Sequence, residues 1–294
     1  MKVTGIGGGH GLSATLQAAR RYASEVRAVV TVADDGGSSG QLSRELGIPP
    51  PGDLRNCLVA LSDDADLTEL FQHRFGTGAL TGHTVGNLLI AALADMTGDF
   101  AAAVEEAGRL IGAKGEVLPA TTELVTLRAR VQGRVVRGQA AVTQTAAPIQ
   151  AVYLLPARPS AYPPAVDAIM SADQVILGPG SLFTSLIATL LVPGIKDALS
   201  ATRARRVFVC NAREQKGETM GLSASAHLEA LLAHAGHDPV DAVVVQDPEL
   251  PSEGVRIDRD ALELMGVSVV AADVAGADGS HDATRLADVL ASLV

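Results

Sequence analysis

The sequence predicts an α/β fold of the Rossmann-like type, a mostly parallel sheet with helices on both faces. Short β-branched runs alternate with helical patterns at both ends of the chain, which is typical of such sheets. Two of these runs, at residues 3–6 and 175–177, lead into glycine turns that open helices. With 294 residues and 47% hydrophobic content, the chain has enough apolar material for one large domain over 1–294.

The N-terminal elements predict a βαβ unit. Residues 3–6 form a buried strand pattern, the glycines from Gly7 to Gly11 predict a loop, and residues 12–22 have helical apolar spacing. Residues 26–33 predict the second strand. The following Asp-Asp-Gly-Gly-Ser-Ser-Gly stretch, at 34–40, is too rich in glycine and serine to continue that strand and predicts a long turn.

A helical block follows this turn. The prolines at 49–51 end a short helix, and Asp53 is a plausible N-cap for the next one. Helices are predicted over 54–61, 67–75, 85–96 and 100–111. We expect the block over 53–113 to sit as an insertion above the carboxyl ends of the strands.

The remaining elements return to the strand–helix alternation. Strands are predicted over 124–131, 135–142 and 149–155, with a hairpin at Gln132-Gly133. The later elements are a helix at 163–172, a strand at 175–177, a helix at 182–191, a strand at 207–210, a helix at 224–234, strands at 242–245 and 267–271, and a helix at 284–293. The uncharged stretch 174–195 is long enough to span a bilayer, but its glycine turn and Pro193 divide it, so no membrane insertion is expected.

Composition excludes several classes of function. A net charge of -10 and an aromatic content of 3% argue against nucleic-acid binding, which depends on Lys/Arg contacts with phosphates and on base stacking. Cys57 and Cys210 fit no metal spacing, and His234 and His237 are separated by a predicted helix end, so no certain metal site is expected. The N-terminus lacks a signal-peptide pattern, which predicts a cytoplasmic protein.

The first glycine turn is the strongest candidate for ligand binding. Glycines between a strand and a helix let the backbone approach a phosphate and direct amides toward it. The segment matches neither a P-loop nor a clean dinucleotide fingerprint, and a tight turn that binds nothing is the alternative. The candidate ligand-binding residues here are Gly8, Gly9, His10, Gly11 and Leu12.

The acidic stretch after the second strand is a further candidate. Asp34 or Asp35 could accept a hydrogen bond from a ribose hydroxyl, or the pair could hold a divalent cation, with Ser38 and Ser39 beside them. A solvated turn is the alternative.

Polar residues also open two otherwise apolar helices. Asp53, Arg55 and Asn56 begin one of them, and His83 and Asn87 lie at the start of the other. Helix capping explains some of these positions, but Asn87 within an apolar helix needs hydrogen-bond partners if it is buried. We therefore include all five among the candidate ligand-binding residues.

A second strand, glycine turn and helix start lies at 177–185. It could bind a second phosphate or the far end of a long ligand. A serine nucleophile is disfavoured, because the Gly-x-Ser-x-Gly pattern and a triad are missing. The candidates in this turn are Gly178, Pro179, Gly180, Ser181 and Thr184.

Taken together, these blocks resemble the YvcK family of bacterial proteins, the gluconeogenesis factors of the CofD superfamily. The resemblance rests on the glycine turn at 7–12, Asp-Asp-Gly-Gly-Ser-Ser-Gly at 34–40, Pro-Pro-Pro-Gly-Asp-Leu-Arg-Asn at 49–56, Gly-His-Thr-Val-Gly-Asn at 82–87, and Leu-Gly-Pro-Gly-Ser at 177–181. It covers nearly the whole chain. Departures are His10, where the family commonly has Thr, and Met220 and Ala226 in place of acidic residues.

The resemblance implies a Rossmann-like protein that binds UDP-sugars, notably UDP-N-acetylglucosamine, and acts in cell shape, wall synthesis and gluconeogenic growth. It adds Asn211, Gln215 and Thr219, from a family segment at 211–219, as binding residues. The alternative is a CofD-like transferase that acts on a nucleotide diphosphate conjugate, with a divalent cation at Asp34, Asp35 or Asp53. An NAD-like dinucleotide ligand and a homo-oligomer both stay open, and we favour a regulatory binding protein over an enzyme.

Overall fold

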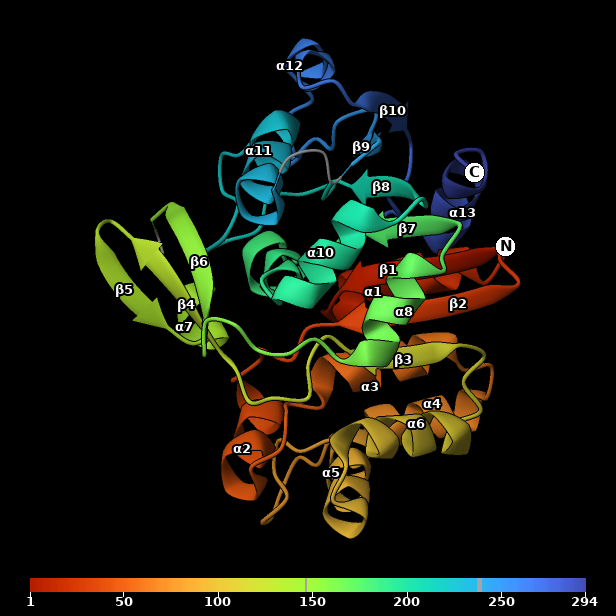
Figure 1. Cartoon of the computed structure of the whole chain (residues 1–294), viewed down its shortest axis with the longest axis vertical. Helices are drawn as coiled ribbons and strands as arrows, with labels where there is room; N and C mark the ends of the chain where they lie inside the picture. Colours follow the sequence, from red (N-terminus) through yellow and green to blue (C-terminus); the bar gives the residue numbers. More distant parts are fainter. Residues whose placement is uncertain (146, 237–239) are drawn as a thin grey trace.

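Seven parallel strands form the centre of the molecule (Figure 1). The computed structural model describes residues 1–145, 147–236 and 240–294, so His237 lies outside the described residues. The sheet order is β10-β9-β8-β7-β1-β2-β3. The strands are β1 (Lys2–Gly7), β2 (Glu25–Val30), β3 (Glu116–Pro119), β7 (Gln174–Leu177), β8 (Arg205–Val209), β9 (Ala242–Gln246) and β10 (Ser268–Ala272). The predicted α/β, Rossmann-like architecture is confirmed.

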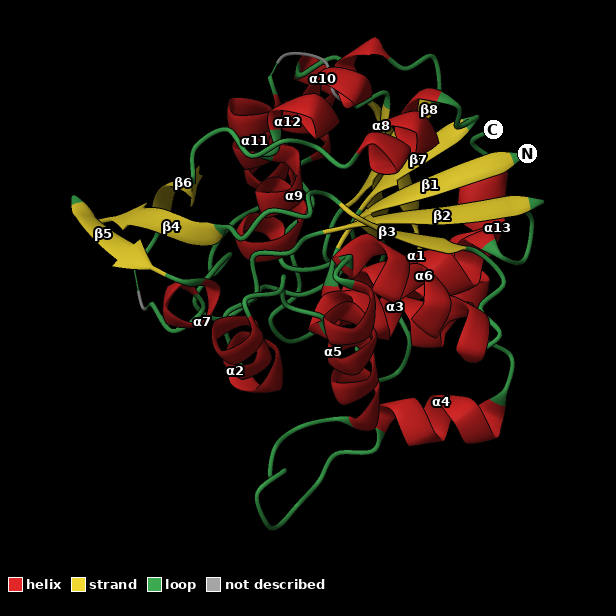
Figure 2. Ribbon diagram, turned by 60° about the horizontal axis from the view of Figure 1, so that its bottom comes forward, coloured by secondary structure: helices red, strands yellow, loops and turns green. Residues whose placement is uncertain are grey.

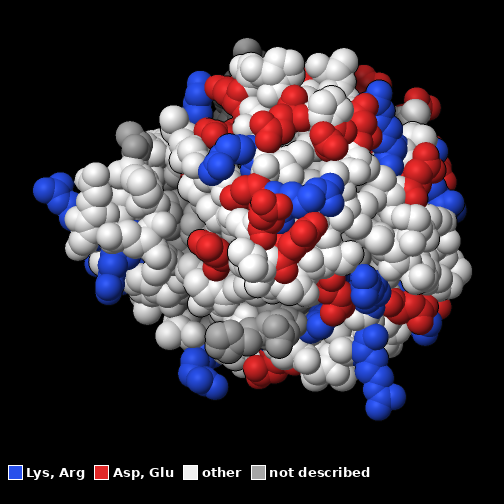
Figure 3. Space-filling view, turned by 90° about the horizontal axis from the view of Figure 1, so that it is seen from above, with Lys and Arg blue, Asp and Glu red and all other residues white. Residues whose placement is uncertain are grey.

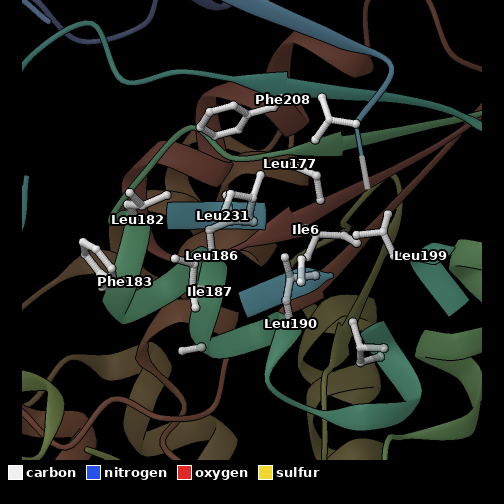
Figure 4. Packing of buried hydrophobic residues seen from close by; sticks show 14 of the residues in the cluster. Ile6, Leu177, Leu182, Phe183, Leu186, Ile187, Leu190, Leu199, Phe208 and Leu231 are labelled. Carbon is white, nitrogen blue, oxygen red and sulfur yellow. The ribbon is translucent and has the colours of Figure 1, made fainter. Parts of the chain in front are cut away.

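Helices cover both faces of this sheet (Figure 2). On one face, α1 (Gly9–Ala19), α3 (Gly52–Leu61), α6 (Phe100–Leu110) and α13 (Ala283–Ala291) share a core with β1 and β2. On the other face lie α8 (Pro163–Met170), α9 (Ala188–Leu190), α10 (Pro193–Ala201) and α11 (Ala224–Ala235). In that second core, Ile6, Leu177 and Phe208 from the strands meet leucines from the helices (Figure 4). Burial on both faces explains why the strand sequences are continuously apolar.

The helical block after β2 does not lie entirely over the carboxyl ends of the strands, as the sequence predicted. The start of α3 is there, because the Asp53 carboxylate is close to the glycine turn after β1, and so is the start of α5 (Val85–Thr97), where Asn87 donates a hydrogen bond to Ser38. Helix α3 then runs back along the sheet, so that Leu61 packs with Val26 near the amino end of β2. Contacts with β3 likewise place α6 on the face. The other helices of this part are α2 (Gly37–Leu46) and α4 (Ala65–Gln72).

Two local predictions were wrong. The expected turn over 34–40 ends early, because Gly37 already begins α2. The expected strand over 135–142 is split into β5 (Arg134–Arg137) and the short helix α7 (Gln139–Val142). Gly138 lies between them at φ +89°, a conformation that favours glycine and breaks the strand.

A three-stranded antiparallel sheet stands apart from the main sheet. It has the order β5-β4-β6, with β4 (Thr126–Val131) and β6 (Ile149–Leu155). The predicted hairpin is confirmed: Gln132 and Gly133 both have positive φ, as a tight turn between paired Val131 and Arg134 requires. This arm, defined as residues 126–155, carries four arginines and no acidic residue, and its blue side chains project on the left of Figure 3.

Further elements were absent from the sequence prediction. They are β3, α10 and α12 (Arg259–Leu264). The helix expected over 182–191 begins as a π-helix, η1 (Leu182–Ile187), before α9. No single helix in the described part of the chain is long and apolar enough to cross a membrane, although η1–α9 and α10 pass that test as a bent pair.

Candidate functional site

The two glycine turns meet where the sheet reverses its winding. The chain passes from β1 through α1 on one face, and from β7 through η1 on the other, while β1 and β7 are neighbours. The helices after these strands therefore lie on opposite faces, and the crevice outside the carboxyl ends of two such strands is the usual ligand position in open α/β sheets. Both glycine turns predicted to bind ligand border this crevice.

Backbone contacts hold the turns together. A Cβ on Gly11 would lie 2.5 Å from the Gly180 Cα, so Gly11 has no space for a larger residue without movement; at Gly180 the φ of +134° is what favours glycine. The Thr15 hydroxyl donates a 2.6 Å hydrogen bond to the Gly178 carbonyl. The Asn211 side chain accepts from the Gly180 N–H and donates to its carbonyl, at 3.0 and 2.9 Å. Asn211 thus shapes the second turn rather than standing free.

A pocket of about 530 Å³ opens beside the joined turns. Six predicted residues line it: His10, Gly11, Pro179, Gly180, Asn211 and Gln215. Its other walls were not predicted from the sequence; they include Ser13 and Gln17 on α1, Arg213, and the loop after β10 at 278–281. Spacing from His10 to Ser13 and Gln17 follows one helical face and was a usable signal, whereas the loop at 278–281 carries no motif.

On the other side of the first glycine turn lies a pair of carboxylates. Asp53 was expected to cap α3, but Pro51 is the N-cap, and the Asp53 carboxylate instead accepts a hydrogen bond from the Gly9 N–H. Burial, followed by the charge of Asp34, raises the pKa of Asp53 to about 7. Asp34 accepts from the Gly36 N–H and from Ser39, and burial raises its pKa as well. Two desolvated acids facing each other favour a proton or a cation between them.

Asp35 does not join this pair. Its carboxylate accepts a 2.9 Å hydrogen bond from the Ala140 N–H and lies against Gly138. Asp35 therefore fixes α7 at the base of the arm, although its charge also raises the pKa of Asp34, to a lesser extent than burial does. Asp34 is the acid whose charge acts on Asp53.

Beyond the carboxylates lies a buried polar cluster. The Ser38 hydroxyl is 3.0 Å from His83 Nδ1 and accepts a 3.1 Å hydrogen bond from Asn87 Nδ2. Asn87 is 3% exposed, yet its Oδ1 has no partner. Arg55 donates to Asn56 Oδ1 at 2.6 Å, and its buried Nε is also unpartnered. The sequence predicted that a buried Asn87 amide would need hydrogen-bond partners. The structure provides one for the amide nitrogen and none for the amide oxygen.

Other predicted residues are occupied within the protein. Thr184 is fully buried, and its hydroxyl donates to Glu218, whose carboxylate also accepts from the Phe183 and Thr184 N–H groups. Thr219 is fully buried and accepts from the Gln215 N–H. Leu12 is a core residue of α1. Ser181 stays partly exposed; its hydroxyl lies 3.5 Å from Gln215 Nε2 and also donates a hydrogen bond to Glu218.

A metal ion would have few protein ligands at this site. Among the described residues, no group of three His, Cys, Asp or Glu side chains could hold one. Asp34 and Asp53 supply only two carboxylates. That number fits Mg²⁺, which takes one or two carboxylates and completes its shell with water and ligand phosphates.

Comparison with known proteins agrees with this geometry. The family described as CofD, 2-phospho-L-lactate transferase, matches residues 3–275. The chain belongs to the CofD family. A Mycobacterium tuberculosis relative is 46% identical over 98% of this chain and 89% of its own length. The Bacillus subtilis protein named gluconeogenesis factor is 40% identical over 100% of this chain and 98% of its own.

A solved structure from this CofD group has the same fold. The crystal structure of a UPF0052 family member from Bacillus halodurans superposes with a TM-score of 0.95 at 39% identity, covering 98% of both chains. The resemblance noted from the sequence motifs is therefore confirmed at the level of the family and of the fold.

Proposed function

We propose that this CofD-family chain binds a nucleoside diphosphate conjugate in the crevice, with UDP-sugars such as UDP-N-acetylglucosamine and UDP-glucose as the first ligands to test. The observation that carries the proposal is the contact between Gly11 and Gly180. This contact places the second glycine turn beside the N-terminus of α1, whose residues His10 and Gly11 line the 530 Å³ pocket, and amides at a helix start together with the helix dipole favour a phosphate.

The negative net charge of the chain does not oppose this ligand. One diphosphate can be bound by backbone amides at a helix start without a basic surface. The relatives' name, gluconeogenesis factor, supports a role in gluconeogenic growth, and we propose that the chain acts there as a regulatory protein. We extend this to cell shape and wall synthesis, as the family resemblance implies.

Isothermal titration tests the binding. UDP-N-acetylglucosamine, UDP-glucose and NAD are titrated separately into the full chain, with and without Mg²⁺. We expect saturable heat with at least one UDP-sugar. No heat with any of the three at about 1 mM ligand, where even a binding free energy near −4 kcal/mol is detectable, contradicts the proposal.

A second function, metal-dependent transfer, is supported by the facing carboxylates of Asp34 and Asp53 and by the name of the matching family. In this alternative Asp34 and Asp53 would hold a divalent cation, which would stabilise negative charge on the diphosphate of the conjugate. It predicts Mg²⁺-dependent turnover of the conjugate, followed by mass spectrometry with a deazaflavin acceptor. Turnover should be lost in Asp34→Asn and kept in Asp95→Asn, a substitution of an exposed acid on α5.

A further inference from the structure

The pocket has one fixed positive charge. Among the described residues that line it, Arg213 is the only lysine or arginine. It belongs to the loop after β8. In a chain with a net charge of -10, such a cation is a distinctive feature of the pocket.

The protein holds the Arg213 side chain in place. Its guanidinium lies against Gly279, where a Cβ would overlap it, and Gly279 has φ +78°, which favours glycine. The Arg213 Nε is buried and has no partner. The backbone of Arg213 also forms an antiparallel bridge with Gly254. An arginine ordered in this way loses little side-chain entropy when it binds an anion.

No acid within the described residues neutralises this cation through an ion pair. Asp278 lies near enough for Arg213 to lower its pKa, but Ser280 is the larger cause of that shift. The Asp278 carboxylate accepts hydrogen bonds from the Ser280 N–H at 3.0 Å and the Ser280 hydroxyl at 2.7 Å. His281, also in the wall, is kept neutral because burial lowers its pKa to about 4. The guanidinium thus remains available to a ligand.

The position of Arg213 separates it from the amides of α1. In the sheet order, β7 lies between β8 and β1, so Arg213 and the first turn of α1 reach the same pocket from different loops. The pocket therefore offers a second anion-binding group in addition to the amides at the start of α1.

We propose that Arg213 is a specificity-determining residue that binds a second anionic group, a carboxylate or phosphate at the distal end of the nucleotide conjugate. This inference rests on the proposed function, since it assumes that the diphosphate lies at α1. It predicts that the preferred ligand carries an anionic group in addition to its diphosphate, as a nucleotide-linked uronic acid or a phosphorylated dinucleotide does. Neutral sugar conjugates would use the same pocket without this contact.

The test compares ligands that differ by one anionic group. UDP-glucuronate is titrated against UDP-glucose, and NADP against NAD, with the wild-type chain, Arg213→Met, Arg213→Lys and Lys216→Met. Met matches the length of the arginine stem without its charge. Lys216 is an exposed cation three residues along the same loop that does not line the pocket, and it serves as the matched control. Thermal melting confirms that each variant is folded.

We expect the acidic member of at least one pair to bind about tenfold more tightly to the wild type, as one charge-assisted hydrogen bond provides. This preference should disappear in Arg213→Met, weaken in Arg213→Lys and persist in Lys216→Met. A preference for UDP-glucuronate over UDP-glucose would identify the anion as a carboxylate, and a preference for NADP over NAD would identify it as a phosphate. Equal affinities within both pairs, or a preference that survives in Arg213→Met, overturn the inference while leaving the proposed function intact. Absence of binding by all four ligands and by UDP-N-acetylglucosamine contradicts both proposals.

Discussion

The backbone N–H of Gly9 donates a hydrogen bond to the carboxylate of Asp53, so the first residue of α1 is already engaged by an acid from α3. A helix start attracts anions, and here the protein supplies one of its own. A bound diphosphate must therefore share the start of α1 with Asp53 or be separated from it by a proton or a cation. The protonation of Asp53 is consequently linked to both stability and ligand binding.

Asp53→Asn tests this linkage through pH. The pKa of Asp53 is raised from 3.8 to about 7, so the stability associated with its protonated form is complete below pH 3.8 and lost as the pH rises through 7. Relative to wild type, the Asn variant should gain about 2 kcal/mol in unfolding free energy between pH 5.5 and 8.5. Urea unfolding at both pH values measures this gain. Asp95→Asn, at an exposed position, should show no such pH dependence, and equal slopes for wild type and Asp53→Asn would contradict the assignment.

Gly9→Ala and Gly98→Ala form a matched pair for the first glycine turn. The two glycines have φ of +61° and +67°; Gly98 has no atom near a new Cβ, and Gly9 has only an Asp53 oxygen at 3.6 Å. Each substitution should cost about 1 kcal/mol of stability through backbone strain. Only Gly9→Ala adds a methyl group beside the start of α1, so only this variant should weaken UDP-sugar binding in a titration. If the two variants bind the UDP-sugar with equal affinity, the first glycine turn is not part of the binding site.

Thr184→Val separates support of the fold from ligand binding. The Thr184 hydroxyl donates a 2.6 Å hydrogen bond to buried Glu218, so its loss should lower the unfolding free energy by about 2 kcal/mol. Because Thr184 is fully buried, ligand affinity should stay at the wild-type value. Denaturation and calorimetry on the same sample check both parts, with Ser181→Ala as the partly exposed comparison. An affinity loss in Thr184→Val without loss of stability would restore Thr184 as a binding residue.

Asp34→Ala and Asp35→Ala should behave differently although the residues are adjacent. Asp35 accepts from the Ala140 N–H and lies against Gly138, so its removal should loosen α7 and the base of the arm. Limited proteolysis should then cut within 138–145 faster in Asp35→Ala than in wild type. Asp34→Ala should keep the wild-type cleavage rate there and lose the charge that raises the pKa of Asp53. The same cleavage rate in both variants would show that Asp35 does not hold the arm.

The sheet could be predicted because its strands are buried on both faces and read as continuous apolar runs. The crevice followed from glycine turns after two such runs. Local sequence could not reveal that Asp35 caps α7, since the two are more than 100 residues apart and meet only in the folded chain. The same holds for Glu218. Its carboxylate accepts a hydrogen bond from the Thr184 N–H, 34 residues earlier in the chain, and so supports the π-helix η1.

Site residues were predicted well where they lie on glycine turns and poorly where they lie on loops without a motif. His10, Gly11 and Gly180 line the pocket as expected. Asn211 and Gln215 came only from the family resemblance. Arg213 and His281 escaped notice because their position depends on Gly279 and on the end of β10, which no spacing pattern encodes.

The pairing of β1 with β7 also has a consequence for the order of synthesis. Val3 pairs with Gln174, so the N-terminal strand emerges from the ribosome long before its second neighbour exists. Until then β1 has an open edge on that side, and only half of the crevice can form. Such long-range pairing slows folding. A nascent chain shorter than about 180 residues should therefore have no functional crevice, however well its first βαβ unit has folded.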